Sequence, residues 1–211
     1  MEKIMELITK YIETVKIGYP IFSSDIHNYV LNAIKDAKPL VINEYINRYE
    51  KKHGDFIRYK KGIYYKCVNT FFGKTKIKYA DLVKRLYLED EGEVYGYETG
   101  PSLINDLGLT TQVPKYLFIA TNKLQVDKVD NSIKLVKPVT KVTKKNYKYL
   151  QVLDVISNKF KVNIEINDYN LILRKEIDKM NLNFEQLLYY ANFYNDNEIY
   201  KKIAELARGE S

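Results

Sequence analysis

One predicted helix carries amide and cationic side chains along a single face: Asn43, Asn47, Arg48 and Lys51. The opposite face is apolar at positions i, i+3, i+4 and i+7, which is the spacing of an amphipathic helix. That apolar stripe consists of Ile42, Tyr45, Ile46 and Tyr49. Asn and Arg side chains can form paired hydrogen bonds to the edges of adenine and guanine in the major groove. A helix with this face could therefore read duplex DNA.

The residues around this helix predict where it begins and ends. Pro39 suits a first helical turn, where its missing N–H is not needed. A Lys-Lys-His run followed by Gly54 favours a helix C-terminus with a left-handed stop at the glycine. The segments 56–59 and 63–66 are rich in β-formers and flank a tight Lys60-Lys61-Gly62 turn, which predicts a hairpin. A helix followed by such a hairpin is typical of a winged helix-turn-helix domain.

The pattern divides the predicted DNA contacts into two kinds. Asn43, Asn47 and Arg48 would read base edges, while the lysines would hold phosphate and set the register. The complete predicted set is Lys38, Asn43, Asn47, Arg48, Lys51, Arg58, Lys60 and Lys61. An amphipathic helix packed on a hairpin, with its charges merely solvated, would show the same pattern. The sequence leaves that alternative open.

The segments before this helix complete a winged domain. The apolar period predicts a helix over residues 2–16, a short extended segment at 21–22 and a second helix over 26–33. Ser23-Ser24-Asp25 offers an N-cap for the second helix. The predicted fold class is α+β: a winged helix-turn-helix domain over residues 1–70, then a mixed C-terminal domain over 71–211 that ends in helices.

A connector is predicted over residues 67–78, across the domain boundary, with Phe71 and Phe72 packing it onto a neighbouring element. A helix is expected next, over 79–90, followed by a short helix that Gly108 ends. The expected strands cover residues 116–121, 124–130 and 133–136. The expected later helices cover 146–158, 168–179, 184–194 and 198–207, with Asn183 and Asn197 as plausible caps.

The charge of the chain is positive and local. Of 211 residues, 34 are Lys or Arg and 27 are Asp or Glu, which gives a net charge of +7. Residues 35–66 hold nine Lys or Arg against four acids, and residues 134–148 hold six lysines and no acid. Two basic blocks favour a polyanionic partner. A lysine-rich composition set by the base composition of the genome would also produce them.

Several functional classes find no support in the sequence. With one cysteine, Cys67, and two histidines, the chain shows no nucleophile–base pair, no metal-ligand spacing and no cofactor motif. We therefore expect a protein that is not an enzyme and needs no metal or cofactor. No run approaches the ~18 apolar residues of a membrane helix, and the N-terminus lacks the features of a signal peptide. The expected location is the cytoplasm.

The segment from Gly96 to Pro114, GYETGPSLINDLGLTTQVP, resembles the shared segment of the DUF6088 proteins. These are relatives of the AbiEi antitoxins of type IV toxin–antitoxin, or abortive infection, systems. The hairpin from Arg58 to Lys66 resembles their wing, and Phe72-Gly73 resembles their connector. The matches cover roughly residues 1–125. The chain departs from the family's more polar lead-in at Asp36-Ala-Lys-Pro-Leu-Val, before the DNA-reading helix.

The resemblance implies a two-part antitoxin. Its winged domain would bind double-stranded DNA at its own promoter and repress its operon. Its C-terminal domain would counter a nucleotidyltransferase-like toxin, with or without direct contact. Two alternatives stay open: a stand-alone transcriptional regulator, and a protein-interaction module that binds no operator and works through the basic block at 134–148 and the C-terminal helices.

Overall fold

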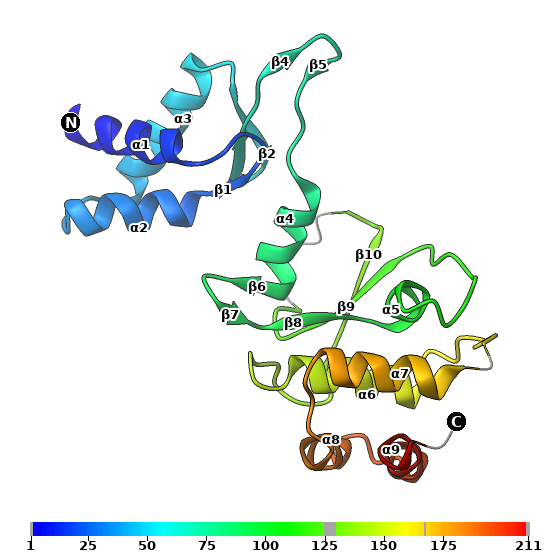
Figure 1. The fold of residues 1–211 in the computed structure, drawn as a ribbon. Coiled ribbons are helices and arrows are strands. Elements are labelled where there is room, and N and C mark those ends of the chain that lie inside the picture. The colour runs from blue at the N-terminus through cyan, green and yellow to red at the C-terminus, as the bar shows by residue number, and fades with distance from the viewer. Residues whose placement is uncertain (1, 125–129, 167, 210–211) are drawn as a thin grey trace. The chain divides into compact units, whose positions relative to one another are not determined.

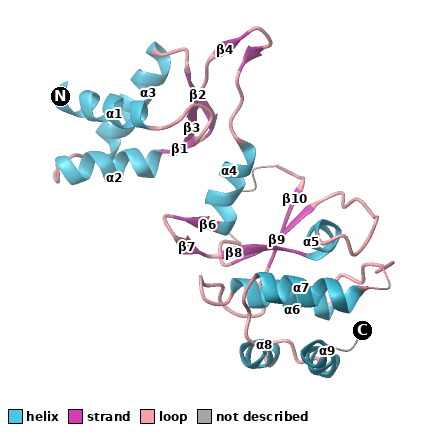
Figure 2. Cartoon of the chain, viewed as in Figure 1, coloured by secondary structure: helices cyan, strands magenta, loops and turns pink. Residues whose placement is uncertain are grey.

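The computed structural model describes residues 2–124, 130–166 and 168–209. The chain forms two compact units, Met1–Leu82 and Val83–Ser211. Both mix helices with small sheets, so the expected α+β class is confirmed (Figure 2). The first unit ends at Leu82, beyond the boundary predicted at residue 70. No helix in the described part of the chain has both the length and the apolar character needed to span a bilayer.

The described part of the first unit contains helices α1 to α3, a three-stranded sheet, a two-stranded hairpin and the start of α4 (Figure 1). In chain order its first six elements are α1 (Glu2–Thr14), β1 (Pro20–Phe22), α2 (Ser23–Ala33), α3 (Pro39–Lys52), β2 (Phe56–Lys60) and β3 (Ile63–Lys66). The strands are antiparallel in the order β1-β3-β2. Apolar side chains of the helices and of β1–β3 form one core, which includes Ile8, Ile12, Ile26 and Val30. This core fixes which face of α3 is left to solvent.

Two helix ends in this unit differ from the predicted ones. Ser23 belongs to α2, and the backbone N–H of Phe22 is bonded instead by Asp25 Oδ2, at 3.1 Å. Asp25 thus reaches back over the first turn, which starts earlier than the Ser-Ser pair suggested. At the end of α3, His53 is extended with φ −115°, and Gly54 is not left-handed. The predicted glycine stop is therefore wrong, because the chain turns directly toward β2.

A second, shorter hairpin follows the sheet. Its strands are β4 (Asn69–Thr70) and β5 (Gly73–Lys74), and Phe71 and Phe72 form its tip. These two side chains are 98% and 96% exposed. The prediction that they pack the connector onto a neighbour is therefore wrong. Backbone pairing, rather than apolar packing, orders this segment.

The second unit is built on a mixed three-stranded sheet. Helix α4 (Tyr79–Val83) contains the division between the units and leads into a π-helical turn, Lys84–Leu88. The expected helix over 79–90 therefore stops early, and β6 (Glu89–Asp90) pairs with β7 (Glu93–Val94). The sheet has the order β10-β9-β8, from β8 (Gly96–Thr99), β9 (Leu117–Thr121) and β10 (Ile133–Val136). Strand β10 runs parallel to β9, and β8 runs antiparallel to it. Most of the strand expected at 124–130 lies outside the described residues.

Helices make up the rest of the second unit: α5 (Gly100–Asp106), α6 (Tyr147–Ser157), α7 (Tyr169–Lys179), α8 (Phe184–Ala191) and α9 (Asn197–Arg208). They share a core that includes Leu153, Leu173, Leu187 and Ile203. Asn183 caps α8 as expected, with Oδ1 accepting from the N–H of Glu185 at 2.7 Å. Asp196, rather than the predicted Asn197, caps α9.

A buried carboxylate lies between the sheet and the helices. Asp154 on α6 is 1% exposed. Its Oδ2 accepts from the hydroxyls of Thr99 at 2.5 Å and Tyr97 at 3.1 Å, and its Oδ1 accepts from Tyr194 at 2.8 Å. Lys159 Nζ lies 3.4 Å from Oδ1. Four donors thus satisfy one carboxylate: two from β8, one just after α6 and one after α8.

Candidate nucleic-acid interface

Helix α3 presents its polar face to solvent because its apolar face packs into the core of the first unit. Ile42, Tyr45, Ile46 and Tyr49 are all buried. The side chains one step round the helix are exposed, and they include four of the predicted DNA contacts: Asn43, Asn47, Arg48 and Lys51. Lys38, which precedes the helix at its N-cap, is exposed too. The amphipathic spacing therefore gives the expected orientation.

A hydrogen-bonded triad joins this face to the neighbouring strand. Arg58 on β2 donates from Nη2 to Asn47 Oδ1 at 2.6 Å and to Glu50 Oε2 at 2.5 Å. The same guanidinium lies 5.4 Å from the ring centre of Tyr64. Arg58 is thus held over the sheet and occupies the amide oxygen of Asn47. In this arrangement Arg58 positions Asn47, and Glu50 offsets part of the local positive charge.

The other polar groups of α3 are also restrained. Asn43 Oδ1 lies 2.9 Å from His27 Nε2, which links α3 to α2. The guanidinium of Arg48 lies 5.3 Å from the ring centre of Tyr45. A cation–π contact does not use the five N–H donors of a guanidinium. Arg48 is therefore the predicted base-reading side chain best placed to donate outward.

The hairpin tip lies at the start of α2. Gly62, with φ +75°, forms the turn, and its carbonyl accepts from the N–H of Ser23 at 2.8 Å. A Cβ at Gly62 would lie 3.1 Å from Ser23 Oγ, so a glycine fits both the turn and the contact. Lys60 and Lys61 are exposed on this turn. The two lysines therefore point to solvent from a backbone that is fixed at both ends.

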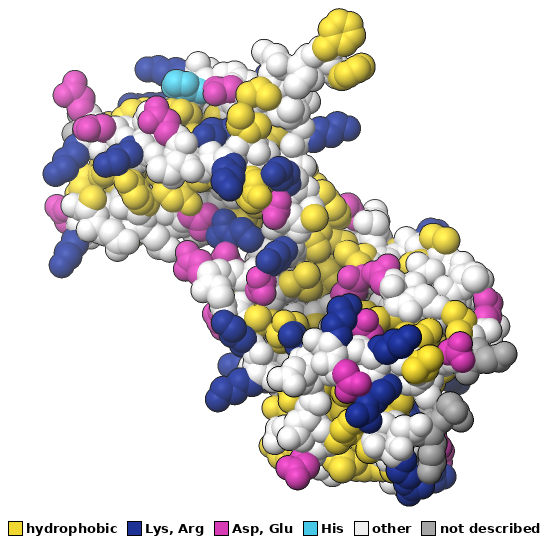
Figure 3. All heavy atoms as spheres, in the orientation of Figure 1, with side chains coloured by type: hydrophobic (Ala, Val, Ile, Leu, Met, Phe, Trp, Pro, Cys, Tyr) yellow, Lys and Arg dark blue, Asp and Glu magenta, His cyan; other side chains and the backbone are white. Residues whose placement is uncertain are grey.

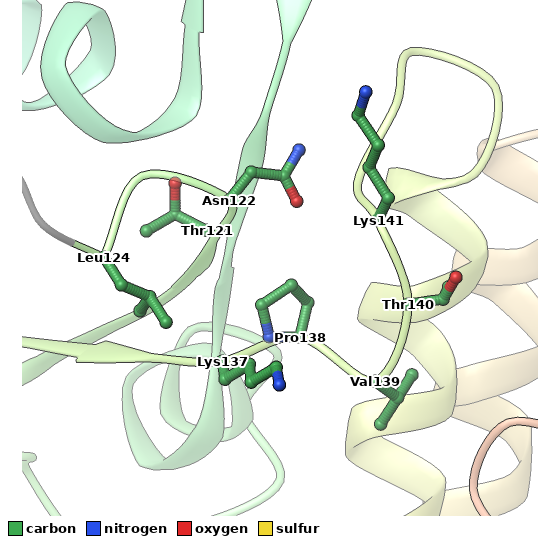
Figure 4. Close-up of a pocket in the computed structure, with 8 residues that line it drawn as sticks. All are labelled: Thr121, Asn122, Leu124, Lys137, Pro138, Val139, Thr140 and Lys141. Carbon is green, nitrogen blue, oxygen red and sulfur yellow. The ribbon is translucent and has the colours of Figure 1, made fainter.

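The second basic block lies elsewhere, on β10 and the segment that leads to α6. Its Lys134 lies over the ring of Tyr116, with Nζ 4.4 Å from the ring centre. Lys137 and Lys141 line an open pocket of about 330 Å³ together with apolar side chains such as Leu124, Pro138 and Val139 (Figure 4). The side chain of Asn122 at its edge holds Val142 by two backbone hydrogen bonds. This surface belongs to the second unit, whereas α3 belongs to the first.

The two surfaces differ in what surrounds their lysines. The first unit contains 15 Lys and Arg against nine Asp and Glu, and the second contains 19 against 18. Basic and acidic side chains are visible on both units in the space-filling view, so the difference lies in the balance of the counts (Figure 3). An excess of positive charge, which attracts a polyanion, therefore belongs to the first unit.

Sequence reasoning placed neither Glu50 nor the exposed Phe71-Phe72 tip in the candidate site. The partner of Glu50 comes from a strand, so helical spacing cannot reveal it. Glu50 lies at i+3 from Asn47, on the border of the polar face, and this spacing could have indicated that Glu50 belongs to the site. For the two phenylalanines the signal was the surrounding Asn-Thr and Gly-Lys residues, which are poor core neighbours.

Comparisons with known proteins identify no family. No protein-family model matches the chain, and no curated protein matches it. Among solved structures, the chain is similar to the crystal structure of the Rv2827c protein from Mycobacterium tuberculosis. The two share 9% sequence identity over 97% of this chain and 76% of that chain, with a TM-score of 0.45.

Proposed function

We propose that the first unit is a winged helix-turn-helix module that binds duplex DNA, with α3 in the major groove and the β2–β3 hairpin against the backbone. The observation that carries this proposal is the solvent-facing α3 surface, where Asn43, Arg48 and Lys51 stand on a helix locked by its apolar face. Such a helix can present hydrogen-bond donors to base edges without reorganising. The lysines at the hairpin tip supply phosphate contacts.

The resemblance of residues 96–114 to the DUF6088 segment supports a proposal for the biological role. We propose that the protein is a type IV antitoxin that represses its own operon by occupying the promoter. The second unit would counter a nucleotidyltransferase-like toxin, and direct contact with that toxin is not required. Repression by occupancy needs no catalytic residue, metal or cofactor.

A salt titration tests the DNA-binding part. We expect Lys60→Ala/Lys61→Ala to weaken binding of every duplex and to reduce the slope of log K against log salt by about 1.8, at ~0.9 for each lost phosphate contact. The matched control, Lys144→Ala/Lys145→Ala, removes the same charge from the second unit and should leave the slope unchanged. Equal slopes for both double variants and the wild type would overturn the assignment of the hairpin.

A sequence-selection assay tests the helix. We expect Arg48→Ala to cost about 1–3 kcal/mol on the preferred duplex and to relax preference at one base pair. Lys51→Ala, on the same face, should weaken all duplexes alike. Unchanged preference in the Arg48 variant would show that α3 does not read the bases through this side chain.

One observation favours a second candidate, a protein-interaction module that binds no operator. Arg58 occupies the amide oxygen of Asn47, and Glu50 places a carboxylate beside it. Both features oppose base readout by Asn47. Growth rescue from the co-expressed toxin distinguishes the candidates. Rescue by a Lys60→Ala/Lys61→Ala variant that no longer binds DNA would separate antitoxin action from DNA binding. Lost rescue would tie the two together.

A further inference from the structure

The β4–β5 hairpin projects two aromatic rings from the first unit. Phe71 and Phe72 occupy the two tip positions, and their rings pack edge-to-face with centres 5.4 Å apart. With 98% and 96% of these side chains exposed, they rank among the most solvent-accessible apolar residues described. Figure 3 shows hydrophobic side chains standing clear of the surface at this tip. Adjacent exposed rings of this size mark an interaction site.

The hairpin is ordered below its tip, so the rings are held at a defined place. Thr75 bonds Val68 twice: the N–H of Thr75 donates to the Val68 carbonyl, and Thr75 Oγ1 accepts from the Val68 N–H, each at 3.0 Å. Thr70 Oγ1 donates to the Gly73 carbonyl at 2.7 Å, and Gly73 adopts φ +100°. Because the ribbon already holds the two rings in place, binding costs little conformational entropy.

The base of the hairpin is attached to the end of α3. Lys74 Nζ donates to the carbonyl of Gly54 at 2.7 Å, two residues after the last residue of α3, Lys52. The aromatic tip therefore extends from the same side of the unit as the C-terminal end of this helix (Figure 1). A duplex bound at the C-terminal end of α3 would lie on the side of the unit from which the hairpin extends.

The charge of the segment that carries the rings indicates the kind of partner. Residues 66–80 contain four lysines, at positions 66, 74, 76 and 78, and no acid. Three of these lysines contact other residues of the unit: Lys66 Nζ and Lys74 Nζ donate to the carbonyls of Glu13 and Gly54, and Lys78 Nζ lies over the ring of Tyr19. A basic segment that carries two exposed rings and no acid is complementary to stacked bases flanked by phosphates. Minor-groove proteins use phenylalanine as a wedge between base pairs in this way.

We propose that the β4–β5 hairpin is a DNA wedge: it inserts Phe71 or Phe72 into a base step of the duplex that α3 contacts, and thereby bends the DNA. The inference rests on the proposed DNA-binding function and adds a second contact surface and a DNA distortion to it. A pyrimidine–purine step, such as TA or CA, is the expected site because such steps unstack most easily.

The test uses the full chain and a duplex from the promoter of its own gene, with donor and acceptor dyes at the two ends. We expect the wild type to bring the dyes closer, and Phe71→Ala/Phe72→Ala to abolish that change. Binding should weaken roughly tenfold, the range of one lost base–aromatic contact, with an unchanged salt slope. Phe71→Leu/Phe72→Leu keeps apolar bulk and should retain most of the bend.

The outcomes separate the two proposals. If the wild type binds and bends the duplex but the double alanine variant does so equally, the wedge is overturned and DNA binding stands. If the wild type binds no duplex, both proposals are overturned. A variant that bends DNA normally but loses growth rescue from the toxin would assign the tip to a protein partner, which also overturns the wedge. Both positions are exposed, so the variants should fold, and circular dichroism checks this.

Discussion

The two units use their polar side chains in opposite ways. In the first, the amides and cations of α3 face solvent, and basic residues outnumber acids by 15 to nine. In the second, basic and acidic residues nearly balance at 19 to 18, and the most elaborate polar cluster is turned inward around Asp154. The polar side chains of α3 are therefore accessible to a partner, whereas those around Asp154 stabilise the fold of the second unit.

This contrast bears on how a buried charged cluster is interpreted. Tyr97, Thr99 and Tyr194 come from β8 and from the chain after α8, and all donate to the same carboxylate on α6. The cluster therefore ties the sheet to the helices, which is a structural role. The surface of α3 is the opposite case, since its polar groups are exposed and bond neighbouring elements only at the surface.

The largest predicted effect comes from removing this carboxylate. Asp154→Ala deletes the acceptor of three hydroxyls and leaves Lys159 without its partner. We expect the free energy of unfolding of the second unit to fall by about 3–5 kcal/mol, the usual cost of breaking a buried charged network. Urea denaturation measures it. Asp36→Ala, an exposed acid of the first unit, should change stability by less than about 0.5 kcal/mol. Equal losses of stability for Asp154→Ala and Asp36→Ala would contradict the structural role of the buried cluster.

High pH should reveal the same inward packing. Burial raises the pKa of Tyr169 to about 12 and also raises the pKa of Tyr97 and Tyr194, with the Asp154 charge adding to the effect on the latter two. The unfolded chain releases these protons near pH 10, before the folded protein does. Stability is therefore complete below about pH 10 and is lost as pH rises through 12. For Tyr169 alone the loss approaches about 3 kcal/mol.

Denaturation at pH ~9 and ~11.5 measures this loss, and tyrosinate absorbance follows the ionisation in a chain with 20 tyrosines and no tryptophan. Tyr169→Phe is the matched variant, since it removes one ionisable hydroxyl whose bond to the Val155 carbonyl is long, at 3.4 Å. The variant should lose less stability than the wild type over this pH range. The same loss in both proteins would show that Tyr169 ionises equally in the folded and unfolded states.

Periodicity predicted the first unit well because its helices are amphipathic and its turns carry glycine. The core stripe of α3 and the β2–β3 hairpin both occur where the spacing of Ile42, Tyr45 and Ile46 and the Lys-Gly turn placed them. The wrong details were helix ends. Asp25 reached back to cap an earlier residue, and Gly54 adopted an ordinary conformation. Such ends depend on single hydrogen bonds that residue type alone does not determine.

The candidate site was predictable as a face but not as a set of contacts. Helical spacing showed that Asn47 and Arg48 lie opposite the core. It could not show that Arg58, from a strand, bonds Asn47 and Glu50. Likewise, two adjacent phenylalanines suggest burial by residue type, and only the β4–β5 pairing shows that they form an exposed tip. Contacts between elements require the tertiary fold.

Substituting one glycine in each unit gives a steric test of the comparison, with a smaller expected loss of stability. A Cβ at Gly96 on β8 would lie 2.0 Å from the Tyr87 carbonyl oxygen and 2.9 Å from that of Ala120. Backbone atoms cannot move aside, so Gly96→Ala should destabilise the second unit by about 1–3 kcal/mol or more. At Gly54 nothing lies within 4 Å and φ is not positive. Gly54→Ala should therefore change stability by less than about 0.5 kcal/mol, as thermal denaturation would show.

The smallest effect concerns Glu50, an acid bonded within the proposed DNA surface. Glu50→Gln removes a negative charge and loosens Arg58, whose side chain is 41% exposed and can then turn toward phosphate. We expect duplex binding to tighten by about 0.5–1 kcal/mol, the scale of an exposed ion pair, and the salt slope to steepen by about 0.9. Glu44→Gln is the matched control, with the same charge change on the same helix but no bond to Arg58. If both variants shift the slope equally, Arg58 gains no phosphate contact, and its role is confined to holding Asn47.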